Sequence, residues 1–273
     1  MDIRLIAMDL DGTALQADRK TFSPRLNAAR QKGAAVVPIT GRQFFILPPA
    51  VHKDVEWAGL VVLSSGGGVR RLTDGELLSA HYMETDALYA LIDMADRMSL
   101  PVEVSALGGL YLTRKSWELL LRAAEGQRWF HLDTVLEGFG HVADDLRAFC
   151  RTTTEVDKAN LPYIPDEARE ETERALNALP LSWFWSGPRS IEIAHPDTFK
   201  ANGLLEACRL LDIDPAHAMA LGDSGNDIPM LQAAGLGVAM GTASPQVQAA
   251  ANAVSAPFDQ DGAALAVERY VLG

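Results

Sequence analysis

The amino-acid sequence predicts an α/β protein in which a doubly wound parallel sheet is interrupted by a smaller inserted α+β domain. Short apolar runs alternate with amphipathic segments in the first third of the chain, and this alternation returns from residue 189. A mixed segment of short strands and helices lies between them. We therefore expect a discontinuous core, residues 1–82 and 188–273, around an inserted domain at residues 83–187.

The chain is expected to begin with a buried strand and a capped helix. Residues 3–10 (IRLIAMDL) form a nearly unbroken apolar run, which is typical of a strand buried on both faces of a parallel sheet. A helix is predicted at 23–33, with Ser23 as its N-cap, Pro24 in its first turn and Gly33 as its stop.

Further strands follow in the first part of the core. Residues 34–40 (AAVVPIT) predict the next strand, although Pro38 lacks the N–H group that a central strand uses. Residues 59–72 predict a strand, a glycine-rich turn and a second strand. In the inserted segment we expect helices at 85–98 and 164–180 and strands at 102–106, 110–113 and 182–186.

The alternation of strands and helices resumes after the insertion. The expected elements are a strand at 189–196, a helix at 200–213, a strand at 217–223, a turn and helix at 225–235, a strand at 236–240 and a helix at 244–251. In an open parallel sheet, ligands bind outside the carboxyl ends of the strands. The residues that follow the predicted strands are therefore the candidates for a functional site.

The charge balance narrows the class of partner. The chain has 24 lysines and arginines against 36 aspartates and glutamates, a formal net charge of −12. This charge argues against nucleic acid or an anionic membrane as the main partner. A small anionic substrate is compatible with it, because a divalent cation can supply positive charge locally.

Targeting and crosslinking features point to the cytoplasm. Cys150 and Cys208 stand in no metal-ligand spacing, so neither a disulfide framework nor a zinc site is expected. No basic segment precedes a long apolar run at the N-terminus, and no stretch approaches the roughly 18 apolar residues of a membrane helix. We expect a cytoplasmic protein without a membrane partner, and the sequence makes no prediction of its oligomeric state.

Asp9 and Asp11 follow the first predicted strand, in the segment DLDGT. An Asp-Gly pair between apolar residues is also common in hairpin turns. The uniformly apolar run before it favours a buried parallel strand instead. Both carboxylates can face the ligand edge of the sheet, where they repel each other unless a cation joins them or one is protonated. Mg²⁺, which prefers oxygen ligands, meets this requirement.

Asp223 follows another predicted buried strand, in the segment GDSGND. An acidic loop in which Asn226 or Asp227 caps the next helix would give the same pattern. A third metal ligand would, however, have to be an acid at the carboxyl end of a second strand, which is the position of Asp223. Asp227 or Asn226 would then orient the ligands. The two segments together predict one metal site.

With both segments present, the chain resembles the haloacid dehalogenase superfamily, in its Cof-like branch of small-molecule phosphatases. The four motifs of that family all have candidates in this chain. They are the segment 9–13, Thr40 at the end of the second strand, Lys200 before a helix, and the segment 222–227. The resemblance covers roughly residues 1–80 and 189–273, and it implies a Rossmann-like core with an inserted cap.

The resemblance implies a role for each residue. Asp9 would attack phosphorus and form an aspartyl-phosphate, and Asp11 would protonate the leaving oxygen. Thr40 and Lys200 complete the implied catalytic set. The implied ligands of Mg²⁺ are Asp9, Asp11, Asp223 and Asp227. The remaining phosphate- or substrate-binding candidates are Leu10, Thr13, Gly41, Arg42 and Asn226. The implied substrate is a sugar phosphate or a similar small phosphorylated metabolite.

One segment departs from the family pattern. Many Cof-like members carry Asn-Gly after the third strand, where this chain reads Ser64-Ser65-Gly66-Gly67. A contact to substrate or cap is expected to differ there. The cap is expected to close over the site and select the substrate, with Arg128, Trp129 and Trp183 as candidate contacts.

The same GDSG segment also resembles the loop around the nucleophile of serine proteases. Those enzymes are disulfide-bearing β-barrels, and the Gly-x-Ser-x-Gly elbow of αβ-hydrolases would need glycine where Asn226 stands. None of the six histidines lies in a diagnostic motif. We therefore interpret Ser224 as a loop residue.

Two alternatives keep the acids and the metal but change the function. A receiver-like phospho-acceptor also forms an aspartyl-phosphate on a doubly wound sheet, but it is a much shorter domain and needs no cap. A phosphomutase or phosphotransferase would pass the phosphoryl group to a hydroxyl in place of water. Release of orthophosphate distinguishes hydrolysis from transfer.

Overall fold

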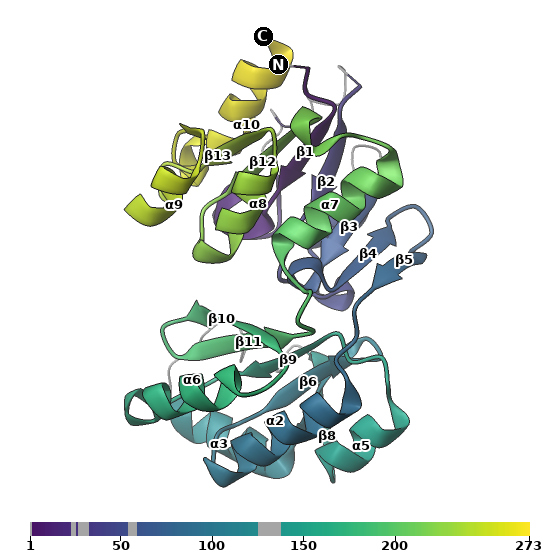
Figure 1. Cartoon of the computed structure of the whole chain (residues 1–273), viewed down its shortest axis with the longest axis vertical. Coiled ribbons are helices and arrows are strands. Elements are labelled where there is room, and N and C mark those ends of the chain that lie inside the picture. Colours follow the sequence, from purple (N-terminus) through teal and green to yellow (C-terminus); the bar gives the residue numbers. More distant parts are fainter. Residues whose placement is uncertain (1, 23–25, 27–32, 54–58, 125–137) are drawn as a thin grey trace. The chain divides into compact units, whose positions relative to one another are not determined.

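The computed structural model describes residues 2–22, 26, 33–53, 59–124 and 138–273 of the chain (Figure 1). Two compact units are present. Unit 1 comprises Met1–Arg42, Leu47–Ala80 and Thr198–Gly273, and unit 2 comprises Gln43–Ile46 and His81–Asp197. Both ends of the chain thus belong to unit 1, and unit 2 is inserted between them.

A parallel sheet forms the core of unit 1. Within the described residues it has five strands in the order β14-β13-β12-β1-β2. The strands are β1 (Leu5–Met8), β2 (Ala35–Pro38), β12 (Ala218–Gly222), β13 (Leu236–Ala239) and β14 (Ala253–Val254). Every residue of β1 and of β12 is buried, as the apolar runs predicted. The expected α/β fold with a parallel core sheet is confirmed.

Pro38 is tolerated because of the direction in which its nitrogen points. Ala35 and Ile39 both donate their N–H groups to carbonyls on the β1 side. Since backbone groups alternate along a strand, the nitrogen of Pro38 faces away from β1. On that side the neighbouring strand is reached through the parallel bridge between Ile39 and Val62. The proline therefore removes no hydrogen bond to the central strand.

The sheet of unit 1 is followed by a smaller antiparallel sheet and by helices. The small sheet consists of β3 (Leu60–Leu63), β4 (Gly68–Arg71) and β5 (Leu77–Ala80). The helices are α1 (Pro49–Lys53), α7 (Lys200–Leu211), α8 (Ile228–Ala233), α9 (Pro245–Ala250) and α10 (Gly262–Val267). Apolar residues of α7 and α8 pack with those of β1, β2 and β12 in one core cluster. The helix predicted at 23–33, with Ser23 and Pro24, lies outside the described residues apart from Leu26 and Gly33.

Unit 2 has its own sheet, its own helices and its own hydrophobic core (Figure 1). Its strand order is β10-β11-β9-β6-β7-β8. The strands are β6 (Glu103–Ala106), β7 (Gly109–Thr113), β8 (Gly140–Ala143), β9 (Lys158–Leu161), β10 (Ser182–Gly187) and β11 (Ser190–Ala194). The helices are α2 (Thr85–Arg97), α3 (Arg114–Ala124), α5 (Leu146–Thr152) and α6 (Arg169–Asn177). The inserted α+β unit is thus a separate sheet with its own core.

One strand lies in a different unit from the one expected. The sequence assigned residues 189–196 to the core, but β11 pairs antiparallel with β9 and β10 inside unit 2. Only Pro188 and Arg189 separate β10 from β11. A connection of two residues allows a hairpin and is too short for the crossover that a parallel core strand needs. Unit 2 accordingly extends to Asp197.

The described residues show no helix that is both long enough and apolar enough to cross a membrane.

Candidate active site

The turn after β1 places Asp9, Asp11 and Thr13 at the carboxyl end of the central strand. The N–H of Asp9 donates to the carbonyl of Leu221 at 3.0 Å, which joins this end of β1 to β12. The chain then turns through residues 10–14, with Gly12 at a φ of 78°. Leu10, a predicted binding residue, is fully buried in the core.

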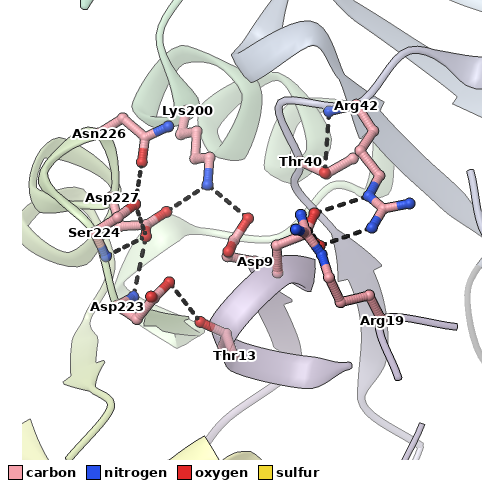
Figure 2. A network of polar contacts seen from close by, with 11 residues as sticks. Asp9, Thr13, Arg19, Thr40, Arg42, Lys200, Asp223, Ser224, Asn226 and Asp227 are labelled. Atoms are coloured by element: carbon pink, nitrogen blue, oxygen red, sulfur yellow. Dashed lines mark hydrogen bonds and ion pairs between the residues drawn. The ribbon is translucent and has the colours of Figure 1, made fainter. Parts of the chain in front are cut away.

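Asp223 lies at the same end of the neighbouring strand and contacts this turn directly. The hydroxyl of Thr13 donates to Oδ1 of Asp223 at 3.3 Å (Figure 2). A Cβ atom at Gly12 would overlap Oδ2 of Asp223. Glycine is therefore required at this position for two reasons, its positive φ and the close approach of the Asp223 carboxylate. The two acidic segments predicted to form one site are in contact.

Lys200, the first residue of α7, joins two of the acids. Its Nζ lies 2.7 Å from Oδ1 of Asp9 and 2.6 Å from Oδ1 of Asp227, and all three residues are buried. The other oxygen of Asp227, Oδ2, accepts the N–H groups of Asp223 and Ser224 at 3.0 and 2.9 Å. Asp227 thus fixes both the lysine and the loop that carries Asp223 (Figure 2).

The start of α7 rests on the turn between β3 and β4. Gly66 has a φ of 108°, and a Cβ atom there would overlap the carbonyl oxygen of Phe199, the residue before Lys200. Ser64 and Ser65 before it also have positive φ values, 49° and 59°. Here the chain departs from the Asn-Gly of many Cof-like proteins, and the turn still packs against the start of α7 through Gly66.

The acids carry more negative charge than Lys200 balances. Burial raises the pKa of Asp9 to about 8, and the neighbouring carboxylates of Asp227 and Asp223 add to the effect against the opposing charge of Lys200. Burial and the charge of Asp227 raise the pKa of Asp223 to about 6. Burial disfavours the ammonium of Lys200, but Asp227 and Asp9 outweigh it and hold its pKa above the usual range.

This cluster suits a divalent metal ion. One carboxylate oxygen from each of Asp9, Asp223 and Asp227 lies within 4.8 Å of the others. The donors are all hard oxygen atoms, which Mg²⁺ prefers. The pKa values of Asp9 and Asp223 are raised because the positive charge of Lys200 does not offset burial and the neighbouring carboxylates. A dication would supply that charge.

Asp11 is turned toward two arginines. Arg42 binds it through Nε at 2.8 Å and Nη2 at 2.7 Å, and Arg19 through Nε at 2.8 Å. Burial raises the pKa of Asp11, but the arginines outweigh burial and hold that pKa below its usual range. Arg19 was not among the predicted site residues. Its sequence surroundings, an exposed loop with ordinary charged residues, contain no feature that marks it.

The remaining predicted residues lie around this arrangement. Thr40 is buried, and its Oγ1 accepts the N–H of Arg42 at 3.1 Å. Gly41 lies between them and is half-buried. The side chain of Arg42 contacts Asp11, and the Oδ1 atom of Asn226 accepts from the hydroxyl of Ser224. Arg42 and Asn226 are thus engaged with protein groups in this structure.

Ser224 is a structural member of the loop. Its Oγ lies 3.0 Å from Oδ2 of Asp227, and Ser224 caps the short turn at residues 225–227. Among the described residues, no histidine is hydrogen-bonded to this hydroxyl, so the general base that a serine nucleophile needs is missing here. The interpretation of Ser224 as a loop residue agrees with this arrangement.

The predicted cap contacts fall into two groups. Arg128 and Trp129 lie outside the described residues. Trp183 packs against the core of unit 2, and its Nε1 donates to Oδ1 of Asn177 at 3.2 Å. Trp183 is therefore a packing residue of the inserted unit.

Comparison with known proteins defines the class. Residues 6–267 match the haloacid dehalogenase-like hydrolase family, and the chain belongs to that family. It is 27% identical over 284 residues to the putative phosphatase YxeH of Bacillus subtilis, covering 98% of both chains. It is 26% identical to the 5-amino-6-(5-phospho-D-ribitylamino)uracil phosphatase YbjI of Escherichia coli, covering 96% of this chain and 94% of that one.

A solved structure agrees in fold. The subclass IIB sugar phosphatase BT4131 superposes with a TM-score of 0.80 at 22% identity, covering 98% of both chains. The parallel core sheet and the separate inserted sheet are the architecture of that subclass. Within its family, the chain is a phosphatase, an enzyme that hydrolyses phosphoric monoesters of small metabolites.

Proposed function

We propose that this phosphatase hydrolyses a sugar phosphate, or a phosphate ester of a similar polyhydroxylated metabolite, through an aspartyl-phosphate on Asp9. The observation that carries the proposal is the position of Asp9. It lies at the end of the central strand, 2.7 Å from Lys200 and in one carboxylate cluster with Asp223. This combines a nucleophile with the positive charge that a phosphoryl group requires.

In the first step, a carboxylate oxygen of Asp9 attacks phosphorus and the bond from phosphorus to the leaving oxygen breaks. Lys200 is bound to Oδ1 of Asp9, which leaves Oδ2 to form the new bond. Asp11 gives its proton to the leaving oxygen, so the product departs as an alcohol. Asp11 has to take up that proton and release at least one arginine beforehand, because Arg42 and Arg19 hold it ionised.

In the second step, Asp11 accepts a proton from water as the water oxygen attacks phosphorus. The bond between Asp9 and phosphorus breaks, orthophosphate leaves, and Asp11 is again protonated. The hydroxyl of Thr40 and the N–H of Gly41 would hold phosphoryl oxygens through these steps. Lys200 would stabilise their charge as an ammonium, a form that its raised pKa preserves.

Asp9 and Asp223 would hold Mg²⁺ by their side chains and Asp11 by its backbone carbonyl. Asp227 is already bound to Lys200 and to two N–H groups, so we assign it the role of orienting the site. When bound, Mg²⁺ neutralises negative charge on the phosphoryl group and on the clustered acids.

The substrate class rests on two relatives. YbjI is named for a phosphate ester of a ribitylamino group, and BT4131 for a sugar phosphate. Both substrates join the phosphate to a polyhydroxylated carbon chain. We infer that this enzyme takes the same class of leaving group.

Orthophosphate release from a panel of phosphate esters tests the proposal. The panel contains sugar phosphates, sugar-alcohol phosphates and p-nitrophenyl phosphate, each with Mg²⁺ or with a chelator. We expect Mg²⁺-dependent release that is fastest for a sugar or sugar-alcohol phosphate and is lost in Asp9→Asn. Asp74→Asn, an exposed acid in the turn after β4, is the matched control and keeps full activity.

The proposal has two separate points of failure. Release that survives in Asp9→Asn would mean that another group attacks phosphorus. Phosphate that is transferred to an added sugar without release of orthophosphate would identify a phosphotransferase.

A further inference from the structure

Unit 2 contains a cluster of metal-ligating side chains that the hydrolytic mechanism does not use. The cluster consists of His81, His195 and Asp197, and one ligand atom from each lies within 4.8 Å of the others. All three residues belong to unit 2. Two imidazole groups and one carboxylate form a donor set unlike the all-carboxylate set of the active site.

The cluster lies where the inserted segment begins and ends. His81 is the first residue of the segment His81–Asp197, and His195 and Asp197 are among its last three residues. In Figure 1 these positions are the connections from β5 to α2 and from β11 to α7. The two connections, separated by the whole inserted segment in the sequence, are brought into contact through these side chains.

The two histidine rings are already arranged side by side. Their centroids are 5.4 Å apart and their planes differ by 26°. The backbone N–H of Asp197 donates to Nδ1 of His195 at 3.2 Å, so Nδ1 carries a lone pair and no proton. Oδ2 of Asp197 lies 3.9 Å from the same nitrogen. Binding of a metal through Nδ1 would therefore require this hydrogen bond to open, with the carboxylate of Asp197 close to the same nitrogen.

We propose that His81, His195 and Asp197 bind a divalent transition-metal ion of the Zn²⁺ or Ni²⁺ type. Imidazole nitrogen with carboxylate oxygen favours these ions over Mg²⁺. Ligand atoms on a tetrahedral Zn²⁺ are about 3.3 Å apart, so the cluster has to contract by about 1.5 Å at most. The carboxylate of Asp197 is 70% exposed and can rotate to make this adjustment.

Such an ion would act as a crosslink. It would join the first residue of the inserted segment His81–Asp197 to its last residues and so close a loop that contains the rest of that segment. Crosslinks that close long loops stabilise a folded unit by restricting its unfolded chain. The site would stabilise unit 2 and would take no part in phosphate hydrolysis.

The test is a calorimetric titration of the whole chain with Zn²⁺ in excess Mg²⁺, repeated in an Asp223→Asn background that impairs the carboxylate site. We expect one Zn²⁺ per chain in both. His81→Ala and His195→Ala each weaken its binding by about tenfold or more. His141→Ala removes a histidine of unit 2 outside the cluster, an exposed one that stacks on Tyr111, and leaves Zn²⁺ binding unchanged.

Thermal unfolding gives a second readout. Zn²⁺ raises the unfolding temperature of the native chain and leaves that of the variant lacking both histidines unchanged. His81→Gln and His195→Gln serve in place of the alanine variants if these lose Mg²⁺-dependent phosphatase activity. Zn²⁺ binding that is absent in the native chain, or equal in the histidine variants, overturns the proposal. These binding measurements do not depend on which substrate the enzyme hydrolyses.

Discussion

Lys200 and Asp9 form a buried ion pair, 2.7 Å between Nζ and Oδ1, although 191 residues separate them in the sequence. Asp227 lies on the other side of the same ammonium at 2.6 Å. One cation thus holds the end of the central strand and the loop after β12 in a single arrangement. The geometry of Asp9, the proposed nucleophile, therefore depends on this lysine before any substrate binds.

Replacing Lys200 by methionine should therefore destabilise the metal-free enzyme. The change leaves two carboxylates buried without their cation, and loss of one partner of a buried ion pair costs about 3–5 kcal/mol. Lys115→Met removes an exposed pair with Asp96 and should cost less than about 1 kcal/mol. Urea unfolding in a chelator measures both free energies. Equal losses of unfolding free energy in the two variants would show that the buried ion pair stabilises the protein no more than the exposed pair does.

Gly12→Ala should weaken Mg²⁺ binding through Asp223. Alanine at a positive φ is strained by about 1–2 kcal/mol, and its Cβ would also displace the Asp223 carboxylate. Gly33 has nearly the same φ, 79°, and no atom of the described residues lies within 4 Å of a Cβ added there. Gly33→Ala therefore introduces the backbone strain without a steric clash. Mg²⁺ titration should show an affinity loss of about 10–100-fold in Gly12→Ala only. Equal affinities would mean that Asp223 does not hold the metal.

Mg²⁺ binding should release protons near neutral pH. The pKa of Asp9 is raised to about 8 and that of Asp223 to about 6, so the metal-free folded state retains protons that the unfolded chain has lost. Its stability should accordingly fall as pH rises from about 4 through 8. Calorimetry in buffers of different ionisation enthalpy counts the released protons. Asp9→Asn should release fewer protons on binding Mg²⁺. An unchanged number of released protons would mean that they come from groups other than Asp9.

Arg42→Lys should alter the pH dependence of the reaction. The guanidinium of Arg42 grips both oxygens of Asp11 and helps to hold its pKa below the usual range. Lysine offers a single point of contact, so the pKa of Asp11 should rise. Because Asp11 first acts in its protonated form, the basic limb of the kcat/KM profile should then move to higher pH. Arg71→Lys, at an exposed ion pair, should leave the profile in place.

The sequence predicted those parts of the fold that depend on local pattern. The apolar runs of β1 and β12 predicted buried strands, and the acids after them were expected at one edge, where Asp9 and Asp223 are found. The strand β9 was not predicted, because Lys158 and Asn160 make it polar. In the structure both are buried, since Lys158 pairs with Glu192 and Asn160 donates to Glu103 on neighbouring strands.

The contacts of Asp11 with two arginines were not predicted from the sequence. Nothing local indicates that Arg19 and Arg42 meet at Asp11, because that contact depends on how a loop folds back over the turn after β1. The position of β11 depended on the length of one hairpin connection. Both features arise from tertiary contacts, which alternating apolar residues do not encode.

The order of strands in the core sheet has a consequence for synthesis of the protein. β1 is made well before its neighbour β12, which begins at Ala218. A growing chain therefore carries an apolar strand with one open edge until most of the chain has been translated, which exposes it to pairing with other chains. Asp9 likewise gains its cation only when Lys200 emerges. Fragments released before that point are expected to aggregate and to have no residual activity.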